Sequence, residues 1–494
     1  MKKINFLDLR KNINCCRDEI KQKINNIIDN TSFIGGSQIK EFEDNFSKYS
    51  GFDYFIGCAN GTDALEIAVQ SLDLNAEDEI IVQGNTYIAT CLSVTNNNLN
   101  LVLCDIDKNT NMICLNDLKN KITKKTKAII VVHLYGLVPN MEEIVSICDE
   151  NNLILIEDCA QAHGAKWKDK CVGNFGKLAC FSFYPGKNLG AFGDAGGIGT
   201  NDIVIQEKIR KIANLGCKIK YHHELIGRNS RMDTIQAVVL DTKLKYLEKN
   251  NELRRRNAQL YIDNLKDIEN IELPMIETNS LPVFHLFVIM TEHRDELQKY
   301  LETKGITTLI HYPISIPETD AYKKNNFIHI QNCITNSKKI LSLPMYPELE
   351  KEEILYVCKN INQYFLENNL LKIKSIKTNN KSGILNCINH VEFDMKRFFY
   401  IDDFDVINKD RGFHANKNCD EILFIVNGSI HIKLINKKNE VVEKKFYKNE
   451  YCYIKSNTWL EFKILEKETK IIVLANETLS NTHSIYNFDE FLRI

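Results

Sequence analysis

The 494-residue sequence predicts an α/β domain followed by an all-β domain. Short apolar runs at 79–84, 99–107, 127–136 and 152–158 are separated by segments with helical periodicity. Strands that alternate with helices favour a parallel sheet built from βαβ units. Beyond residue 386 the pattern changes to closely spaced strands, among them EILFIVNG and SIHIKLIN, with short turns between them. Strands without intervening helices are typical of a β-sandwich or barrel.

Further elements surround the four apolar runs of the first domain. A glycine-rich turn at 57–61 leads directly into a periodic segment, TDALEIAVQSL, which predicts a helix. A strand-like run, LPVFHLFVIM, follows in the smaller part of this domain. Helical patterns predict five more helices, at 13–30, 39–49, 240–268, 335–341 and 350–367.

The segment IKSIKTNNKSG, at 373–383, separates the two patterns. It is polar, has no large apolar residue other than isoleucine, and ends in glycine, as linkers commonly do. We therefore expect a first domain at 1–372, with a large part at about 1–240 and a small part at about 241–372, a linker at 373–385, and an all-β domain at 386–494.

Charge and cysteine content narrow the functional classes. With 63 basic and 65 acidic residues, the net charge of −2 gives no sign of a nucleic-acid or membrane-surface protein. No apolar run reaches the roughly eighteen residues of a membrane span, and the opening MKKINFLDLRKNI lacks the apolar centre of a signal peptide. The 16 cysteines include no CxxC pair. We therefore expect a cytoplasmic protein with reduced thiols.

The strongest chemical signal is a lysine in a glycine-rich loop. Lys187 lies in FSFYPGKNLGAFGDAGG, after an aromatic run that predicts a buried strand. Asp158 ends another apolar run, LILIED, earlier in the chain. Enzymes that use pyridoxal 5′-phosphate (PLP) need such a pair: the lysine forms a Schiff base with the cofactor, and the carboxylate keeps its pyridinium nitrogen protonated. A solvated loop lysine is the plain alternative, but its surroundings favour PLP.

A PLP site also needs an anchor for the phosphate group. In ANGTDAL, Gly61 and Thr62 fall at the start of a predicted helix, where free backbone N–H groups and the helix dipole attract a phosphate. The segment could equally be an ordinary helix cap, since Thr and Asp both cap helices well. Because the same chain also contains the pair Asp158 and Lys187, we favour the phosphate site over an ordinary cap.

Residues 1–370 resemble the DegT/DnrJ/EryC1/StrS family of PLP-dependent sugar aminotransferases along nearly their whole length. The similarity is carried by FIGG, NGTDAL, GNTYIAT, IEDCAQAHGA, FSFYPGKNLGAFGDAGG, GRNSRMDTIQA, LIHYP and SLPMYPEL, in the order and spacing of that family. The resemblance implies the PLP fold type I of the aspartate aminotransferases, with a large seven-stranded α/β part, a smaller C-terminal part, and a homodimer whose active sites lie at the interface.

The same resemblance implies a role for each matching residue. Lys187 would bind the cofactor and shuttle the proton, Asp158 would pair with the pyridinium nitrogen, and Gln161 would lie near the ring hydroxyl. The other implied contacts are a stacking ring at Tyr87, phosphate ligands at Gly61, Thr62 and Ser182, a phosphate contact from Asn229 of the partner subunit, and the sugar side at His311 and Tyr312. From the residues alone, Tyr87 could belong to the core and His311 could be structural.

The lysine also bears on the type of reaction. Some relatives have histidine in its place and act as dehydratases, so Lys187 favours transamination. In this family glutamate is the usual donor, and the acceptor is a ketone on a nucleotide-linked sugar, because a hydroxyl cannot form the imine. The chain has HYPIS where HYPIP is commoner, so Ser315 bears on loop shape and sugar preference.

Residues 386–494 resemble a small cupin (jelly-roll) family, the dTDP-4-keto-6-deoxyhexose 3,4-ketoisomerases. KRFFYIDDF, RGFHANKNCDEILFIVNGSIHIKL and YCYIKSNTWLEF carry the similarity. Isomerase members usually have His-Ala-His, whereas this chain has His414-Ala415-Asn416. Histidine can exchange a proton near neutral pH and asparagine cannot. His414 could serve both carbons as a single base, or the domain could be a non-catalytic sugar-binding or dimerising module.

Two further expectations concern this second domain. No second histidine stands near His414, so we expect no metal site. Arg411 could contact the diphosphate of a nucleotide sugar or be an ordinary surface arginine.

The sequence therefore predicts an aminotransferase that moves an amino group from glutamate to a dTDP-linked keto-6-deoxyhexose in deoxyamino-sugar biosynthesis. The fused cupin favours C3 as the acceptor carbon, because a 3,4-ketoisomerase would deliver a 3-keto sugar. The alternative is a C4 aminotransferase with a non-catalytic cupin module. A PLP-sensing regulator is disfavoured, since neither a helix-turn-helix signal nor a basic DNA-binding segment is present.

Overall fold

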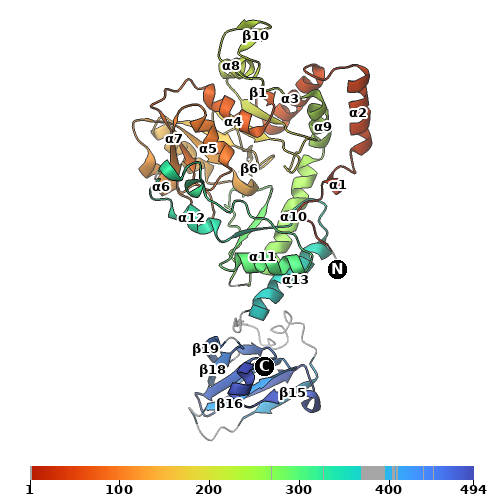
Figure 1. Ribbon diagram of the computed structural model, residues 1–494, viewed down its shortest axis with the longest axis vertical. Coiled ribbons are helices and arrows are strands. Elements are labelled where there is room, and N and C mark those ends of the chain that lie inside the picture. Colours follow the sequence, from red (N-terminus) through yellow and green to blue (C-terminus); the bar gives the residue numbers. More distant parts are fainter. Residues whose placement is uncertain are drawn as a thin grey trace. The chain divides into compact units, whose positions relative to one another are not determined.

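The computed structural model describes residues 3–368 and 395–493, except 269, 326, 403–406, 408, 409, 438 and 449. The chain divides into two compact units, Met1–Ile361 and Asn362–Ile494 (Figure 1). The linker predicted at 373–385 lies outside the described residues. Among the helices of the described ranges, none combines the length and the apolar character needed to cross a membrane.

A seven-stranded sheet lies at the centre of the first unit. Its strands are β1 (Tyr54–Cys58), β2 (Glu79–Gln83), β3 (Asn100–Cys104), β4 (Thr126–Val132), β5 (Ile154–Asp158), β8 (Leu178–Ser182) and β9 (Gly196–Thr200). They follow the order β1-β9-β8-β5-β4-β2-β3. The pairs from β3 to β8 are parallel, while β9 is antiparallel to both β8 and β1. The α/β prediction is confirmed, because the four apolar runs form β2 to β5.

The large part also contains helices, several of which pack on this sheet (Figure 1). They are α1 (Leu9–Asn12), α2 (Arg17–Asp29), α3 (Ser37–Ser50), α4 (Gly61–Gln70), α5 (Ile88–Thr95), α6 (Leu115–Lys121), α7 (Met141–Glu150), α8 (Ile203–Ala213) and α9 (Thr234–Leu244). Two small sheets complete the large part, formed by β6 (Lys166–Trp167), β7 (Lys170–Cys171) and β12 (Ser280–Leu281), and by β10 (Cys217–Ile219) and β11 (His222–His223).

Both faces of the sheet are buried, which explains why its central strands are almost continuously apolar. Ile80 and Val82 pack into one core cluster with residues of α4 and α5, such as Ile67. Ile81 points to the other face and packs into a second cluster with α3 residues, such as Phe42. Alternate side chains of a single strand therefore supply two separate cores.

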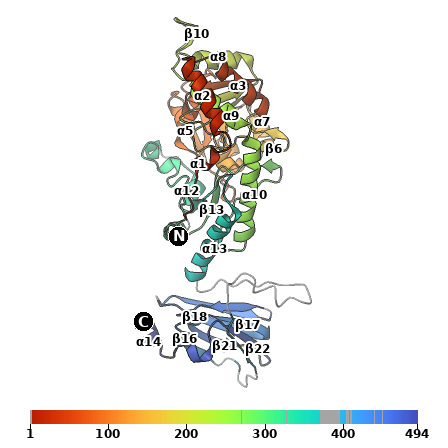
Figure 2. The same ribbon diagram turned by 90° about the vertical axis from the view of Figure 1, so that its right-hand side faces the viewer.

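The smaller part of the first unit corrects two helix predictions. It contains α10 (Leu247–Leu265), β13 (Phe287–Met290), α11 (Arg294–Thr303), α12 (Gln331–Ser337), β14 (Ile340–Leu343) and the larger part of α13 (Lys351–Asn368). The single helix predicted at 240–268 is two helices, α9 and α10, and α10 extends from the large part into the smaller part (Figures 1 and 2). The end of the helix predicted at 335–341 is strand β14, whose buried apolar residues pair with β13. So short an apolar run has no distinctive period.

The second unit is an all-β sandwich, as predicted. Its strands are β15 (Arg397–Ile401), β16 (Asp410–Asn416), β17 (Glu421–Asn427), β18 (Ser429–Ile435), β19 (Val441–Tyr447), β20 (Tyr451–Ile454), β21 (Trp459–Ile464), β22 (Lys470–Ala475) and β23 (Ser484–Ile485), followed by α14 (Phe488–Arg493). They form two antiparallel sheets, β15-β22-β17-β20 and β19-β18-β21-β16-β23 (Figure 2). Leu423, Ile432, Phe462 and Val473 belong to the core that both sheets share.

Candidate active site

Lys187 and Asp158, the predicted cofactor-binding pair, lie at the same edge of the central sheet. Asp158 is the last residue of β5, and Lys187 lies in the loop that follows β8. Strands β5 and β8 are parallel neighbours, with Asp158 in register with Cys180. Ligands of α/β sheets gather outside the carboxyl ends of such strands. The Asp158 side chain is only 5% exposed, so the site pairs a buried carboxyl group with a lysine.

The surroundings of Lys187 favour its neutral amine. Burial lowers the pKa of Lys187 to about 8, and the charge of Asp158 opposes this shift. Three histidines interact with Lys187, and burial lowers the pKa of each: to about 3 for His163, to about 4 for His311, and well below its usual value for His285. Neutral neighbours leave Asp158 as the main charge that acts on the lysine. A neutral amine is the nucleophilic form that can attack a carbonyl group.

Hydrogen bonds hold the Asp158 carboxylate in place. The Thr90 hydroxyl donates to Oδ2 at 2.8 Å, and the Ala160 N–H donates to Oδ1 at 3.1 Å. Burial raises the pKa of Asp158, while these two bonds and the charge of Lys187 oppose the rise. Thr90 lies on α5 and also contacts the Thr86 hydroxyl at 2.8 Å. Thr90 is the last residue of the motif GNTYIAT, but it was not among the predicted site residues, because nothing in the motif relates its hydroxyl to Asp158.

The predicted phosphate ligands lie together at the start of α4. The Asn60 side chain caps the helix by accepting from the Asp63 N–H at 2.8 Å. The N–H groups of Gly61 and Thr62, the first in the helix, have no intrahelical acceptor. A Cβ atom on Gly61 would lie 2.5 Å from the Cβ of Ser182. The helix start and the end of β8 therefore approach so closely that only glycine fits.

Aromatic side chains border the site next to Asp158. The ring of Tyr87 is 55% exposed, which excludes the alternative that it belongs to the core, and it lies 5.5 Å from the ring of Tyr312. The Gln161 amide donates to the Tyr312 hydroxyl at 3.0 Å and accepts from the Tyr135 N–H at 2.6 Å. The structure thus brings together three of the predicted residues, Gln161, Tyr87 and Tyr312.

His311 and Asn229 differ in how firmly they are held. His311 Nδ1 lies 2.9 Å from the Ser342 hydroxyl, and its ring stacks on Phe6 with centroids 5.6 Å apart. These contacts give it a structural role as well as a place beside Tyr312. Asn229 is exposed and pairs through its backbone with Asn214. Its contact with a partner subunit stays a prediction.

The side chains of this site fit PLP. Lys187 and buried Asp158 lie at the same edge of the sheet, and the exposed ring of Tyr87 borders the site. The first N–H groups of α4 lie where Gly61 closely approaches Ser182. Lys187 and Asp158 would hold the ring, and Gly61, Thr62 and Ser182 would hold the phosphate.

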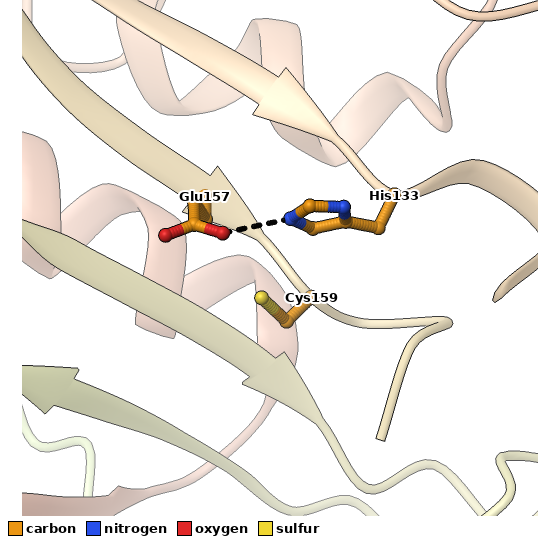
Figure 3. Close-up of side chains that lie close together, drawn as sticks. All are labelled: His133, Glu157 and Cys159. Carbon is orange, nitrogen blue, oxygen red and sulfur yellow. Dashed lines mark hydrogen bonds and ion pairs between the residues drawn. The ribbon is translucent and has the colours of Figure 1, made fainter. Parts of the chain in front are cut away.

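Figure 3 shows a second buried group, His133, Glu157 and Cys159, whose ligand atoms are close enough to hold a metal ion. The hydrogen bonds of Glu157 argue against that use. Its Oε1 accepts from the N–H groups of Phe175 and Gly176, both at 2.7 Å. Its Oε2 accepts from the Gly173 N–H at 2.7 Å and lies 2.9 Å from His133 Nε2. Four partners fill the acceptor sites of a carboxylate, so Glu157 anchors the 173–176 turn.

In the second unit, the candidate residues lie along β16. Asn416 is buried, and its Oδ1 accepts from the Ser484 hydroxyl at 2.6 Å. The ring of His414 lies 6.0 Å from that of Tyr486. Arg411 pairs with Phe462 across the sheet, so its contact with a diphosphate stays a prediction.

Family models match both units of the chain. Residues 14–362 match the model described as the DegT/DnrJ/EryC1/StrS aminotransferase family. Residues 367–494 match the model described as WxcM-like, C-terminal.

Characterised relatives match the first unit. The chain is 42% identical over 361 residues to a dTDP-3-amino-3,6-dideoxy-alpha-D-galactopyranose transaminase of Aneurinibacillus thermoaerophilus, which covers 73% of this chain and 99% of the relative. It is 35% identical over 364 residues to a dTDP-3-amino-3,4,6-trideoxy-alpha-D-glucose transaminase of Streptomyces venezuelae, and the match covers 73% of this chain and 96% of that relative. The solved structure of S. venezuelae DesV with a ketimine intermediate has a TM-score of 0.72 and 35% identity, and covers 74% and 99% of the two chains. The predicted fold type I is confirmed.

Proposed function

This chain belongs to the DegT/DnrJ/EryC1/StrS aminotransferase family, and we propose that it moves an amino group from glutamate to C3 of a dTDP-linked keto-6-deoxyhexose. The observation that carries the proposal is the pair formed by Lys187 and buried Asp158. The acceptor carbon is supported by two relatives whose names place the new amine at C3 of a dTDP-sugar.

The residues of the first unit divide the work of transamination. PLP, when bound, supplies an electron-accepting ring that weakens the bond to a proton next to the transferred nitrogen. Lys187 takes that proton at Nζ and returns it on the other side of the C–N bond. Asp158 would pair with the protonated ring nitrogen, and the hydrogen bonds from Thr90 and Ala160 favour the ionised form of Asp158. Tyr87 would cover one face of the ring.

The second unit supports C3 as the acceptor carbon. We propose that it converts a 4-keto sugar into the 3-keto sugar that the first unit aminates, with His414 as one proton-transfer group. A C4 aminotransferase with a non-catalytic cupin is the second candidate. Asn416 favours that candidate, because an amide cannot exchange a proton and its oxygen is already bonded to Ser484.

A homodimer is supported by large apolar side chains that remain exposed on the first unit. Ile219, Tyr221 and Ile226 lie in or beside the β10–β11 hairpin, near exposed Asn229 in the sequence, and Ile34 and Phe192 are also exposed. Apolar surface of this kind commonly marks an interface between copies of a chain. Sedimentation of the full chain should give twice the monomer mass.

The product of the full chain tests the proposal. The protein is incubated with dTDP-4-keto-6-deoxyglucose and glutamate, and the position of the new amine is read by NMR. Nitrogen at C3, with release of 2-oxoglutarate, is the expected result. Nitrogen at C4 would support the second candidate instead, and a protein that never binds PLP would contradict the aminotransferase assignment itself.

A further inference from the structure

Charged side chains lie inside the otherwise apolar sandwich of the second unit. Leu423 and Ile425 of β17 belong to the shared core. Glu421 lies on the same face of that strand, because alternate side chains share a face. Arg397 of β15 and Glu421 both pair with Ala475 of the strand between them. Residues in register point to the same face of a sheet, so Arg397 and Glu421 both face the interior.

His414 and Asn416 enter the same region from the opposite sheet. His414 is in register with Leu460, which belongs to the shared core. Both His414 and Asn416 act on the Glu421 carboxyl group: a charged His414 stabilises its ionised form, as does the Asn416 side chain. Two facing sheets therefore place a carboxyl group, an imidazole, a guanidinium and an amide in one cluster.

Several polar atoms of this cluster lack the hydrogen bonds that a purely structural cluster would provide. Glu421 is 5% exposed, yet its ion pair with Arg397 spans 3.4 Å. The Nε and Nη1 atoms of Arg397 are buried and have no hydrogen-bond partner among the residues that the structure describes. Burial raises the pKa of Glu421, although His414, Arg397 and Asn416 oppose the rise. Buried polar groups are normally hydrogen-bonded, and exceptions often mark a functional site.

We propose that Glu421 is the second proton-transfer group of a sugar ketoisomerase site, beside His414, and that it replaces the histidine absent at position 416. The inference rests on the proposed function, in which the second unit makes a 3-keto sugar. It also removes the objection raised by Asn416: the missing group is supplied from the facing sheet by β17.

The isomerisation needs two groups that exchange protons, and no oxidant or reductant. The Glu421 carboxylate takes the proton from C3, whose bonding electrons form a C3–C4 double bond while His414 protonates O4. His414 then takes the proton from the O3 hydroxyl, and a carbonyl group forms at C3. As this carbonyl forms, the electrons of the C3–C4 double bond accept the proton of Glu421, which becomes bonded to C4. Both side chains return to their starting states, and the ketone has moved from C4 to C3.

Hydrogen exchange in heavy water tests this role without the aminotransferase reaction. The full chain is mixed with dTDP-4-keto-6-deoxyglucose in D₂O without an amino donor, and NMR follows the 3-keto sugar and the deuterium at C3 and C4. Glu421→Gln should slow isomerisation by about 100-fold or more. Glu443→Gln, on exposed β19, is the matched control and should stay within about twofold of wild type.

A second substitution separates proton transfer from packing. Glutamine has nearly the volume of glutamate, so a packing role predicts that Glu421→Gln is tolerated better than Glu421→Asp. Proton transfer predicts the reverse, since aspartate keeps a carboxylate. Restored isomerisation in the double variant Glu421→Gln/Asn416→His would give further support.

The outcomes separate this inference from the proposed function. Isomerisation by wild type that persists unchanged in Glu421→Gln would overturn the role of Glu421 and leave the proposed function standing. Wild-type protein that shows no isomerisation, yet aminates C4 when glutamate is added, would overturn the proposed function and this inference together.

Discussion

The two units hold a buried carboxyl group in contrasting ways. Asp158 accepts two short hydrogen bonds, from Thr90 and Ala160, and interacts with one lysine. Glu421 is equally buried but meets its arginine only at 3.4 Å, in a cluster where Arg397 keeps unused N–H groups. The Asp158 carboxylate is therefore fixed by the protein's own hydrogen bonds, whereas Arg397 has N–H groups that could donate to a ligand. The site of the second unit is also where the chain departs from the usual His-Ala-His motif, at Asn416, whose side-chain oxygen bonds to Ser484.

Replacing the lysine should have the largest effect. Lys187→Arg keeps a positive charge, but a guanidinium cannot serve as the nucleophilic amine or release its proton near neutral pH. We expect the formation of 2-oxoglutarate from glutamate to fall by more than about 1,000-fold. Lys177→Arg, at an exposed position, is the control and should change little. Isomerisation in D₂O should persist in Lys187→Arg; its loss would break the division of work between the units.

Removing the charge of Asp158 should come next. Asp158→Asn keeps the size of the side chain but loses the carboxylate that we propose pairs with the protonated ring nitrogen. We expect the turnover number to fall by about 100-fold, with the bound cofactor still detectable by its absorbance. An unchanged turnover number would show that the buried carboxylate is not the partner of the ring.

The pKa of Lys187 predicts a pH dependence for the uptake of PLP by apo-protein. Because burial lowers this pKa to about 8, most of the amine is protonated below pH 8 and only the neutral fraction can attack. The rate of uptake should rise about tenfold per pH unit up to about 8 and then level off. Stopped-flow absorbance would measure it. A rate that keeps rising toward pH 10 would indicate an ordinary lysine.

A smaller effect is expected from the hydroxyl that supports Asp158. Thr90→Val removes a hydrogen bond to a charged group, worth about 1.5 kcal/mol or more, so the turnover number should fall about tenfold. Thr95→Val on the same helix is the matched control, because its hydroxyl bonds to Tyr322 instead. Equal effects of the two substitutions would mean that Thr90 acts through helix stability alone.

Sequence patterns predicted the parts of the molecule that depend on local order. Buried parallel strands are continuously apolar, which is why β2 to β5 could be predicted; Asp158 ends β5, and Lys187 lies in the loop after β8. Thr90 could not be placed, because a hydroxyl on a helix has no pattern that reveals its partner. Part of strand β14 was mistaken for helix, since a run of four buried residues, three of them apolar, fits either period.

The cluster of the second unit was harder to predict from the sequence. Glu421 opens the strand EILFIVN at a position whose alternate neighbours, Leu423 and Ile425, are apolar and inward-facing. A charged residue in phase with a core face was therefore a visible signal. Its partners Arg397 and His414 are distant in sequence, and only the pairing of the strands brings them to the same interior.

Amination of a 4-keto sugar should depend on the ketone that the second unit supplies. Glu421→Gln is offered two substrates in turn, each with glutamate, and the amino sugar formed is measured. We expect the variant to aminate a dTDP-linked 3-keto-6-deoxyhexose as fast as wild type and to fail with the 4-keto isomer. Amination of the 4-keto isomer at the wild-type rate would show that the first unit does not depend on isomerisation by Glu421.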